Sequence, residues 1–122
     1  MTSSDGPTEL LALARDVADG RHQMPDMNQA RAVCLLTRQA FEQVVDALLG
    51  ARGLACPAAS MRARLISLGQ AFGSDPEHVA YRAETAWSGL SAACHHHAYE
   101  LSPSLSEART LVDEVAWLSG QR

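Results

Sequence analysis

The strongest constraint on the fold is a series of apolar residues that recurs at steps of three and four between about Asn28 and Leu49. This spacing places side chains on one face of an α-helix. Leu35, Leu36 and Ala40 widen the apolar stripe, so we expect this helix to be central and contacted on several sides. The members of the stripe itself are Ala30, Val33, Cys34, Thr37, Phe41, Val44, Val45, Leu48 and Leu49.

Four further segments show the same helical periodicity, and none of the chain alternates with the period of two that is typical of strands. Proline, glycine and capping residues set the expected limits. A Ser74-Asp75-Pro76-Glu77 capping box precedes one helix, and Glu107 follows Ser104 by three at the start of the last. The four helices are expected from Pro7 toward Gly20, at about Ala58–Phe72, at about Asp75–His97, and from Ser102-Pro103 to Gly120.

These segments predict an all-α protein, an up-and-down bundle of four to five helices joined by short loops. At 122 residues and 47% hydrophobic content the chain suits one globular domain over residues 1–122. Residues 1–6 are expected to form a flexible tail.

The charge balance and the cysteines indicate which partners and which cellular compartment to expect. The chain carries 10 basic residues, all arginine, against 14 acidic ones, and this balance disfavours broad non-specific binding of nucleic acid. RNA therefore stays a possible partner without support from charge. Three widely spaced cysteines, without a CxxC pair, indicate free thiols in a reducing compartment. We find no secretory signal and no apolar run long enough to span a bilayer, so we expect a cytoplasmic protein without membrane contact.

The one concentration of chemical side chains is WSGLSAACHHHAYELS, residues Trp87–Ser102, which holds three of the five histidines. Successive helical residues point about 100° apart, so three adjacent histidines cannot share a face. His97 continues the apolar series of Leu90 and Cys94. His95 continues a polar line that includes Glu84, and His96 continues a line of small residues that includes Gly89 and Ala92.

The line of small residues needs an explanation, because glycine inside a helix lowers stability by about 1 kcal/mol relative to alanine. Small side chains permit a close approach by another helix, by a second subunit or by a ligand. We therefore take Gly89, Ala92, His97, Tyr99 and Glu84 as candidate ligand or interface residues, and His95 and His96 as candidate catalytic residues.

Three interpretations of the histidine triplet remain open. Histidines in a last helical turn stabilise the negative end of the helix dipole, and we favour this structural interpretation. A general acid or base is the second, since histidine titrates near neutral pH. A metal site is the third; it lacks the His-x-x-x-His or Glu-x-x-His spacing that would place two ligands on one helix face, so we predict no metal. No nucleotide or phosphate motif is present, and no cofactor is predicted.

The segment RAVCLLTRQAFEQVVDALLGARGL (Arg31–Leu54) resembles the second helix of the HEPN superfamily. Those helices often carry an aromatic or Gln-rich "QA-E" segment, followed by an apolar run that ends in a glycine turn. The helix order and lengths across about Thr8–Leu118 are similar too. The matching residues are Gln39, Ala40, Glu42, Leu48, Leu49 and Gly53.

The resemblance implies a helical bundle that usually dimerises, in bacterial conflict or RNA-processing systems. Many members are metal-independent ribonucleases with an Arg-(4–6 residues)-His motif, and others are inactive partners of small nucleotidyltransferases. Here no arginine occupies residues 88–92 before the triplet. We therefore expect a non-catalytic HEPN-like module that acts by association, as a homodimer or with a small protein partner.

Two alternatives stay open beside it. The first is a metal-independent ribonuclease with His95 or His96 as general base and an arginine, such as Arg82 or Arg109, supplied from another helix or subunit. The second is a bundle that binds a small ligand in a groove beside Gly89 and Ala92.

Overall fold

The structure, a computed structural model, describes residues 6–23, 28–73, 77–94 and 103–121. These residues form five α-helices and no strand, which confirms the predicted all-α class. None of these helices combines the length and the apolar character needed to cross a bilayer. The helices are α1 (Pro7–Ala18), α2 (Gln29–Gly50), α3 (Met61–Phe72), α4 (Val79–Cys94) and α5 (Leu105–Ser119).

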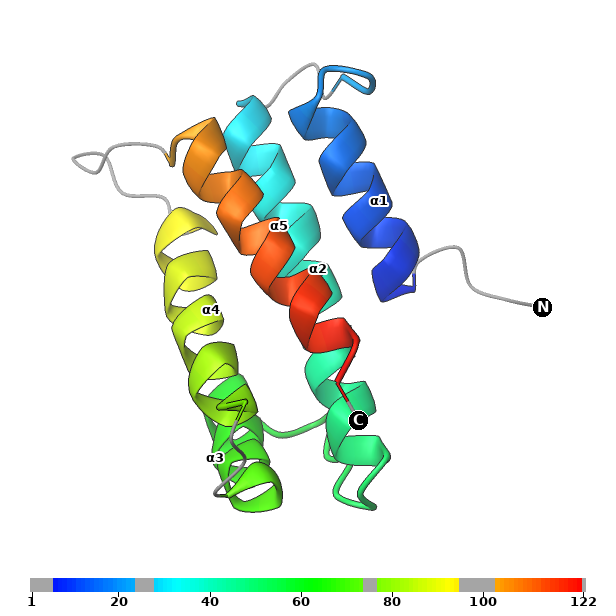
Figure 1. The fold of residues 1–122 in the computed structure, drawn as a ribbon, viewed down its shortest axis with the longest axis vertical. Coiled ribbons are helices and arrows are strands. Elements are labelled where there is room, and N and C mark those ends of the chain that lie inside the picture. The colour runs from blue at the N-terminus through cyan, green and yellow to red at the C-terminus, as the bar shows by residue number, and fades with distance from the viewer. Residues whose placement is uncertain (1–5, 24–27, 74–76, 95–102, 122) are drawn as a thin grey trace.

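The helices form an up-and-down bundle around α2. In Figure 1, α1 and α4 run upward, α2 and α5 run downward, and α3 lies beside the lower half of α4. Helix α2 packs against each of the other four helices, whereas α1 contacts only α2 and α5. The prediction of a central second helix is therefore confirmed.

The core is the apolar stripe of α2 together with the inward faces of its neighbours. Phe41 and Leu49 of α2 are fully buried, and so are Leu90 of α4 and Leu118 of α5. Thr37 is buried in the same stripe, and its Oγ1 donates a hydrogen bond of 2.7 Å to the carbonyl oxygen of Val33. A polar residue can therefore sit in the core without an unsatisfied donor.

Capping residues set most helix ends as predicted. Pro7 lies in the first turn of α1, as predicted, and Gly6 is the N-cap. Residues 1–5 of the predicted tail lie outside the described residues. Asn28 caps α2 by accepting from the Arg31 amide. At α5 both hydrogen bonds of the Ser104–Glu107 capping box are present.

Two predicted helix starts are wrong. Helix α3 begins at Met61 rather than Ala58, because the Ser60 hydroxyl accepts from the Ala63 amide and caps the helix there. Helix α4 begins at Val79 rather than Asp75, after His78 with a positive φ of 56°. The predicted cap at residues 74–76 and the predicted end of this helix at His97 lie outside the described residues.

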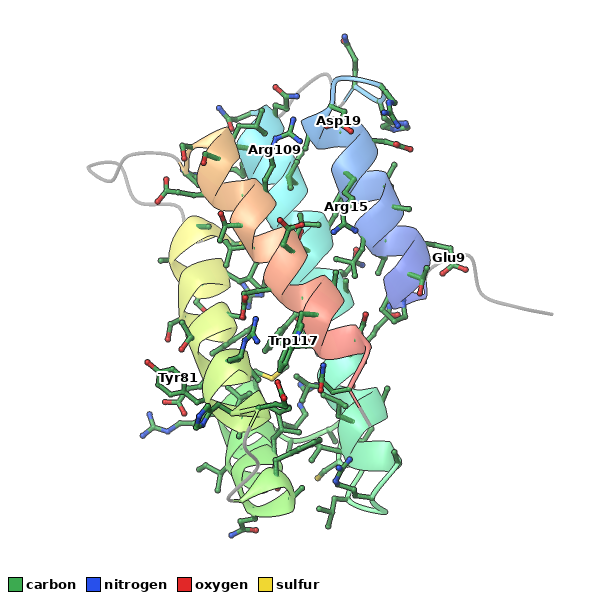
Figure 2. The ribbon with its side chains drawn as sticks, viewed as in Figure 1. Glu9, Arg15, Asp19, Tyr81, Arg109 and Trp117 are labelled. Carbon is green, nitrogen blue, oxygen red and sulfur yellow. The ribbon has the colours of Figure 1, made fainter. Side chains whose placement is uncertain are left out.

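The ends of α1 and α5 are joined by polar contacts near residue 19. Arg109 donates to the Asp19 carboxylate at 2.8 Å and to the Ala18 carbonyl oxygen at 2.7 Å, and Figure 2 shows the two side chains facing one another. The hydrogen bond from Arg109 lowers the pKa of Asp19. Gln29 of α2 also donates to the Val17 and Ala18 carbonyls, so side chains satisfy the last carbonyls of α1.

The conformation of His78 gives a stability prediction. A left-handed backbone costs an L-residue roughly 1–2 kcal/mol, and glycine avoids this cost but loses more entropy on folding. We expect His78→Gly to raise the free energy of unfolding by about 1 kcal/mol in urea denaturation. Ala51, at the C-cap of α2, has a φ of −63°, so Ala51→Gly should lower the same quantity. Equal effects of the two substitutions would contradict the assignment of strain to His78.

Candidate functional site

The outer face of α4 is the surface that carries most of the described candidate residues. We define it as Tyr81, Glu84, Thr85, Ser88 and Ala92, all of which are exposed. Tyr81 is the most exposed large hydrophobic residue of the described chain, at 71%, and points away from the bundle in Figure 2. The Thr85 hydroxyl donates to the Tyr81 carbonyl oxygen at 3.0 Å, so it needs no further acceptor.

Gly89 lies between this face and α5. A Cβ atom built on Gly89 would lie 2.9 Å from Cδ2 of Leu111, so the missing side chain admits Leu111 of α5. Of the three kinds of close approach expected from sequence, the structure shows the approach of another helix of the same chain. Glu84 and Ala92 thus share the outer face of α4, and Gly89 belongs to the α4–α5 contact.

This contact predicts how a side chain added at position 89 changes the stability of the protein. The leucine side chain in Gly89→Leu must displace Leu111, and overpacking of this kind costs about 2 kcal/mol. Gly89→Ala should be close to neutral, because the tip of a leucine can move aside and alanine favours the helix by about 1 kcal/mol. Chemical denaturation of both variants tests this. A Gly89→Leu protein as stable as the parent would show that Leu111 does not restrict the space.

The other predicted site residues, His95, His96, His97 and Tyr99, lie outside the described residues. The chain immediately before them is described, and two arginines of α2 approach it. Arg31 donates from Nη1 to the Cys94 carbonyl oxygen at 3.4 Å. The Arg38 guanidinium lies 4.9 Å from the centre of the Trp87 ring. Arg31 and Arg38 therefore flank the C-terminal end of α4.

Sequence reasoning missed these two arginines. It named Arg82 and Arg109 as arginines that another helix or subunit could supply to the triplet, and in the structure both arginines pair with other groups. Arg82 forms a bidentate pair with Glu114 at 2.8 and 3.0 Å, and lies 3.6 Å from the centre of the Trp117 ring. The hydrogen bond to Glu114 raises the pKa of Arg82. The sequence feature that could have identified these arginines is the seven-residue spacing of Arg31 and Arg38, which puts both on one edge of α2.

The cysteines differ sharply in exposure: Cys34 is buried, Cys94 is half-buried and Cys56 is exposed. Burial raises the pKa of the Cys34 thiol from 9.0 to about 11, with a smaller contribution from Cys94. Burial also raises the pKa of Cys94, against the opposing effect of Arg38. The raised pKa values leave little of the reactive thiolate form at Cys34 and Cys94, as expected for core cysteines. In the part of the chain that is described, no three histidine, cysteine or acidic side chains cluster to hold a metal ion.

Comparisons with protein-family models, with curated proteins and with solved structures find no significant match to this chain. The functional assignment therefore depends on the outer face of α4 and on the residues around its C-terminal end.

Proposed function

We propose that the chain is a non-catalytic HEPN-like helical module that acts by association, as a homodimer or with a protein partner. The observation that carries the proposal is the outer face of α4, which covers three helical turns and whose residues are all exposed. Its exposed tyrosine is of a residue type enriched at protein interfaces, which supports a contact role.

The distribution of charge also supports association rather than catalysis. Arginines pair with carboxylates of other helices at Arg15–Asp113, Arg64–Asp46, Arg82–Glu114 and Arg109–Asp19. These pairs link different parts of the bundle instead of converging on one site. The outer face of α4 carries a single charged residue, Glu84, so contact there desolvates few charges.

Sedimentation velocity over a concentration series tests the proposal. We expect the sedimentation coefficient of the purified protein to rise with concentration, or a partner to be recovered by pull-down. Ser88→Glu adds a charge at the middle of the outer face and should abolish the rise. The matched control is Gln70→Glu, which adds the same charge at an exposed position of α3. A protein that stays monomeric and captures no partner would refute the proposal, as would association unaffected by Ser88→Glu.

One observation favours the metal-independent ribonuclease as a second candidate. Arg31 of α2 contacts the carbonyl oxygen of Cys94, and Cys94 is the residue that precedes His95 in the sequence. An arginine and a histidine are the chemical types needed for acid–base catalysis beside a phosphate. Cleavage of labelled RNA that is lost in His95→Ala or His96→Ala, and weakened in Arg31→Ala, would support it. Cleavage that survives all three substitutions would remove this site.

The remaining alternative, a groove for a small ligand beside Gly89 and Ala92, gains no such support. The side chain of Leu111 lies where a ligand against Gly89 would have to bind.

A further inference from the structure

We infer that Cys34 and Cys94 are a redox-sensitive pair, in which a hydroperoxide converts the two thiols into a disulfide that joins α2 to the C-terminal end of α4. Both thiols are free in the structure, which therefore shows the reduced state. The inference goes beyond the proposed function, because it holds whether or not the chain associates. In a reducing compartment, disulfides that do form are usually transient and serve catalysis or redox sensing.

The placement of the two cysteines follows from a repeated layer in the contact between α2 and α4. The two helices run in opposite directions (Figure 1). Phe41 of α2 stacks on Trp87 of α4 with ring centroids 5.7 Å apart. Cys34 lies seven residues before Phe41, and Cys94 lies seven residues after Trp87. Seven residues are nearly two helical turns, so the same step along both antiparallel helices brings Cys34 opposite Cys94.

The arginines of α2 show the same register. The Arg38 guanidinium lies 4.9 Å from the centre of the Trp87 ring, and seven residues earlier Arg31 donates to the Cys94 carbonyl oxygen at 3.4 Å. In both layers the α2 residue that faces α4 is fully buried and its α4 neighbour is half-buried. Cys94 also contributes to the raised pKa of Cys34, an effect that requires the two groups to lie close together.

A disulfide fits between facing positions of two packed helices. The axes of such helices are about 8–10 Å apart, and each Cα atom lies about 2.3 Å from its own axis. Facing Cα atoms therefore lie within about 6 Å of one another. A disulfide needs Cα atoms about 4.4–6.8 Å apart, so the two sulfur atoms can join without a rearrangement of the bundle.

The half-buried Cys94 is the thiol that an oxidant reaches first. Its thiolate attacks the hydroperoxide, an S–O bond forms as the O–O bond breaks, and Cys94 becomes a sulfenic acid while water or an alcohol leaves. The Cys34 sulfur then attacks the Cys94 sulfur. The S–S bond forms, the S–O bond breaks, and the departing hydroxide takes the Cys34 proton and leaves as water. One hydroperoxide is thus reduced by two electrons for each disulfide formed.

The surroundings of the pair set its rate of oxidation. Burial raises the pKa of Cys94, while Arg38 and Arg31 oppose this effect and favour the thiolate. Little thiolate is present at neutral pH, so we expect slow oxidation that requires a high dose of peroxide. The product would fix the end of α4 to α2 at the residue that precedes the histidine triplet in sequence.

Peptide mapping of the oxidised Cys56→Ser protein tests the inference. This substitution removes the exposed native thiol and leaves the contact between α2 and α4 unchanged. The folded protein is treated with hydrogen peroxide, remaining thiols are alkylated, and the digest is analysed by mass spectrometry. We expect a peptide with Cys34 joined to a peptide with Cys94 in a monomer that is lighter by two hydrogen atoms. The urea midpoint should rise on oxidation and return with dithiothreitol.

The matched control is Cys94→Ser in the same Cys56→Ser background, which removes one partner at a half-buried position. Its urea midpoint should not rise with peroxide. Alkylation of both cysteines after peroxide treatment of the folded protein would overturn the inference. So would separate oxidation of each cysteine without a link, or a link that forms only in urea-unfolded protein. Each of these results leaves association intact, since neither cysteine belongs to the outer face of α4.

Discussion

Replacement of Phe41 by alanine should lower the free energy of unfolding by about 3–5 kcal/mol, the range for removal of a buried aromatic side chain. Phe41 is fully buried at the middle of α2, the helix that contacts all the others. Its ring stacks on Trp87 of α4 with centroids 5.7 Å apart and an interplanar angle of 19°. The substitution therefore removes core volume and also an aromatic contact between α2 and α4.

Urea denaturation followed by circular dichroism measures this effect. The matched control is Leu35→Ala, because Leu35 lies on the same helix but is 38% exposed. We expect that variant to lose less than about 1 kcal/mol, as removal of a partly exposed side chain leaves no closed cavity. Equal losses in the two variants would contradict the assignment of Phe41 to the centre of the core.

The second large effect is a loss of stability at alkaline pH caused by Cys34. Burial holds the pKa of this thiol at about 11 in the folded protein, against 9.0 as its ordinary value. The unfolded chain loses the proton first, so stability is intact below pH 9 and falls as pH rises toward 11. The shift corresponds to roughly 2–3 kcal/mol over that interval.

Comparison of Cys34→Ala with the parent protein isolates this contribution. Urea denaturation of both proteins at pH 7, 9 and 10.5 gives the two pH profiles. The parent should lose more stability than the variant between pH 9 and 10.5, whatever their difference at pH 7. Parallel profiles would show that the Cys34 thiol is not protected by burial.

Apolar periodicity was sufficient to predict the fold class and the central helix, because the α2 stripe reports directly which side chains are buried. Helix starts were harder. The sequence placed the start of α3 at about Ala58, whereas the hydrogen bond from the Ala63 amide to the Ser60 hydroxyl caps the helix at Met61. The start of α4 depends on the backbone of His78, whose positive φ of 56° was not expected from the sequence.

The candidate site was predictable only in part. Helical geometry placed Glu84 apart from Gly89, but it grouped Gly89 with Ala92, whereas in the structure Ala92 is exposed and Gly89 faces Leu111 of α5. The α4 sequence does not indicate that neighbour. The approach of Arg31 to Cys94 joins residues 63 positions apart, and such contacts depend on how α2 and α4 pack. Local periodicity contains no information on that packing.

Association through the outer face of α4 is the central claim, and hydrogen–deuterium exchange at low and high protein concentration tests it most directly. We predict that peptides from α4 (Val79–Cys94) exchange more slowly at high concentration, while peptides from α1 (Pro7–Ala18), on the far side of the bundle, do not change. Exchange that is independent of concentration in α4, or slowed only in another helix, would contradict the claim.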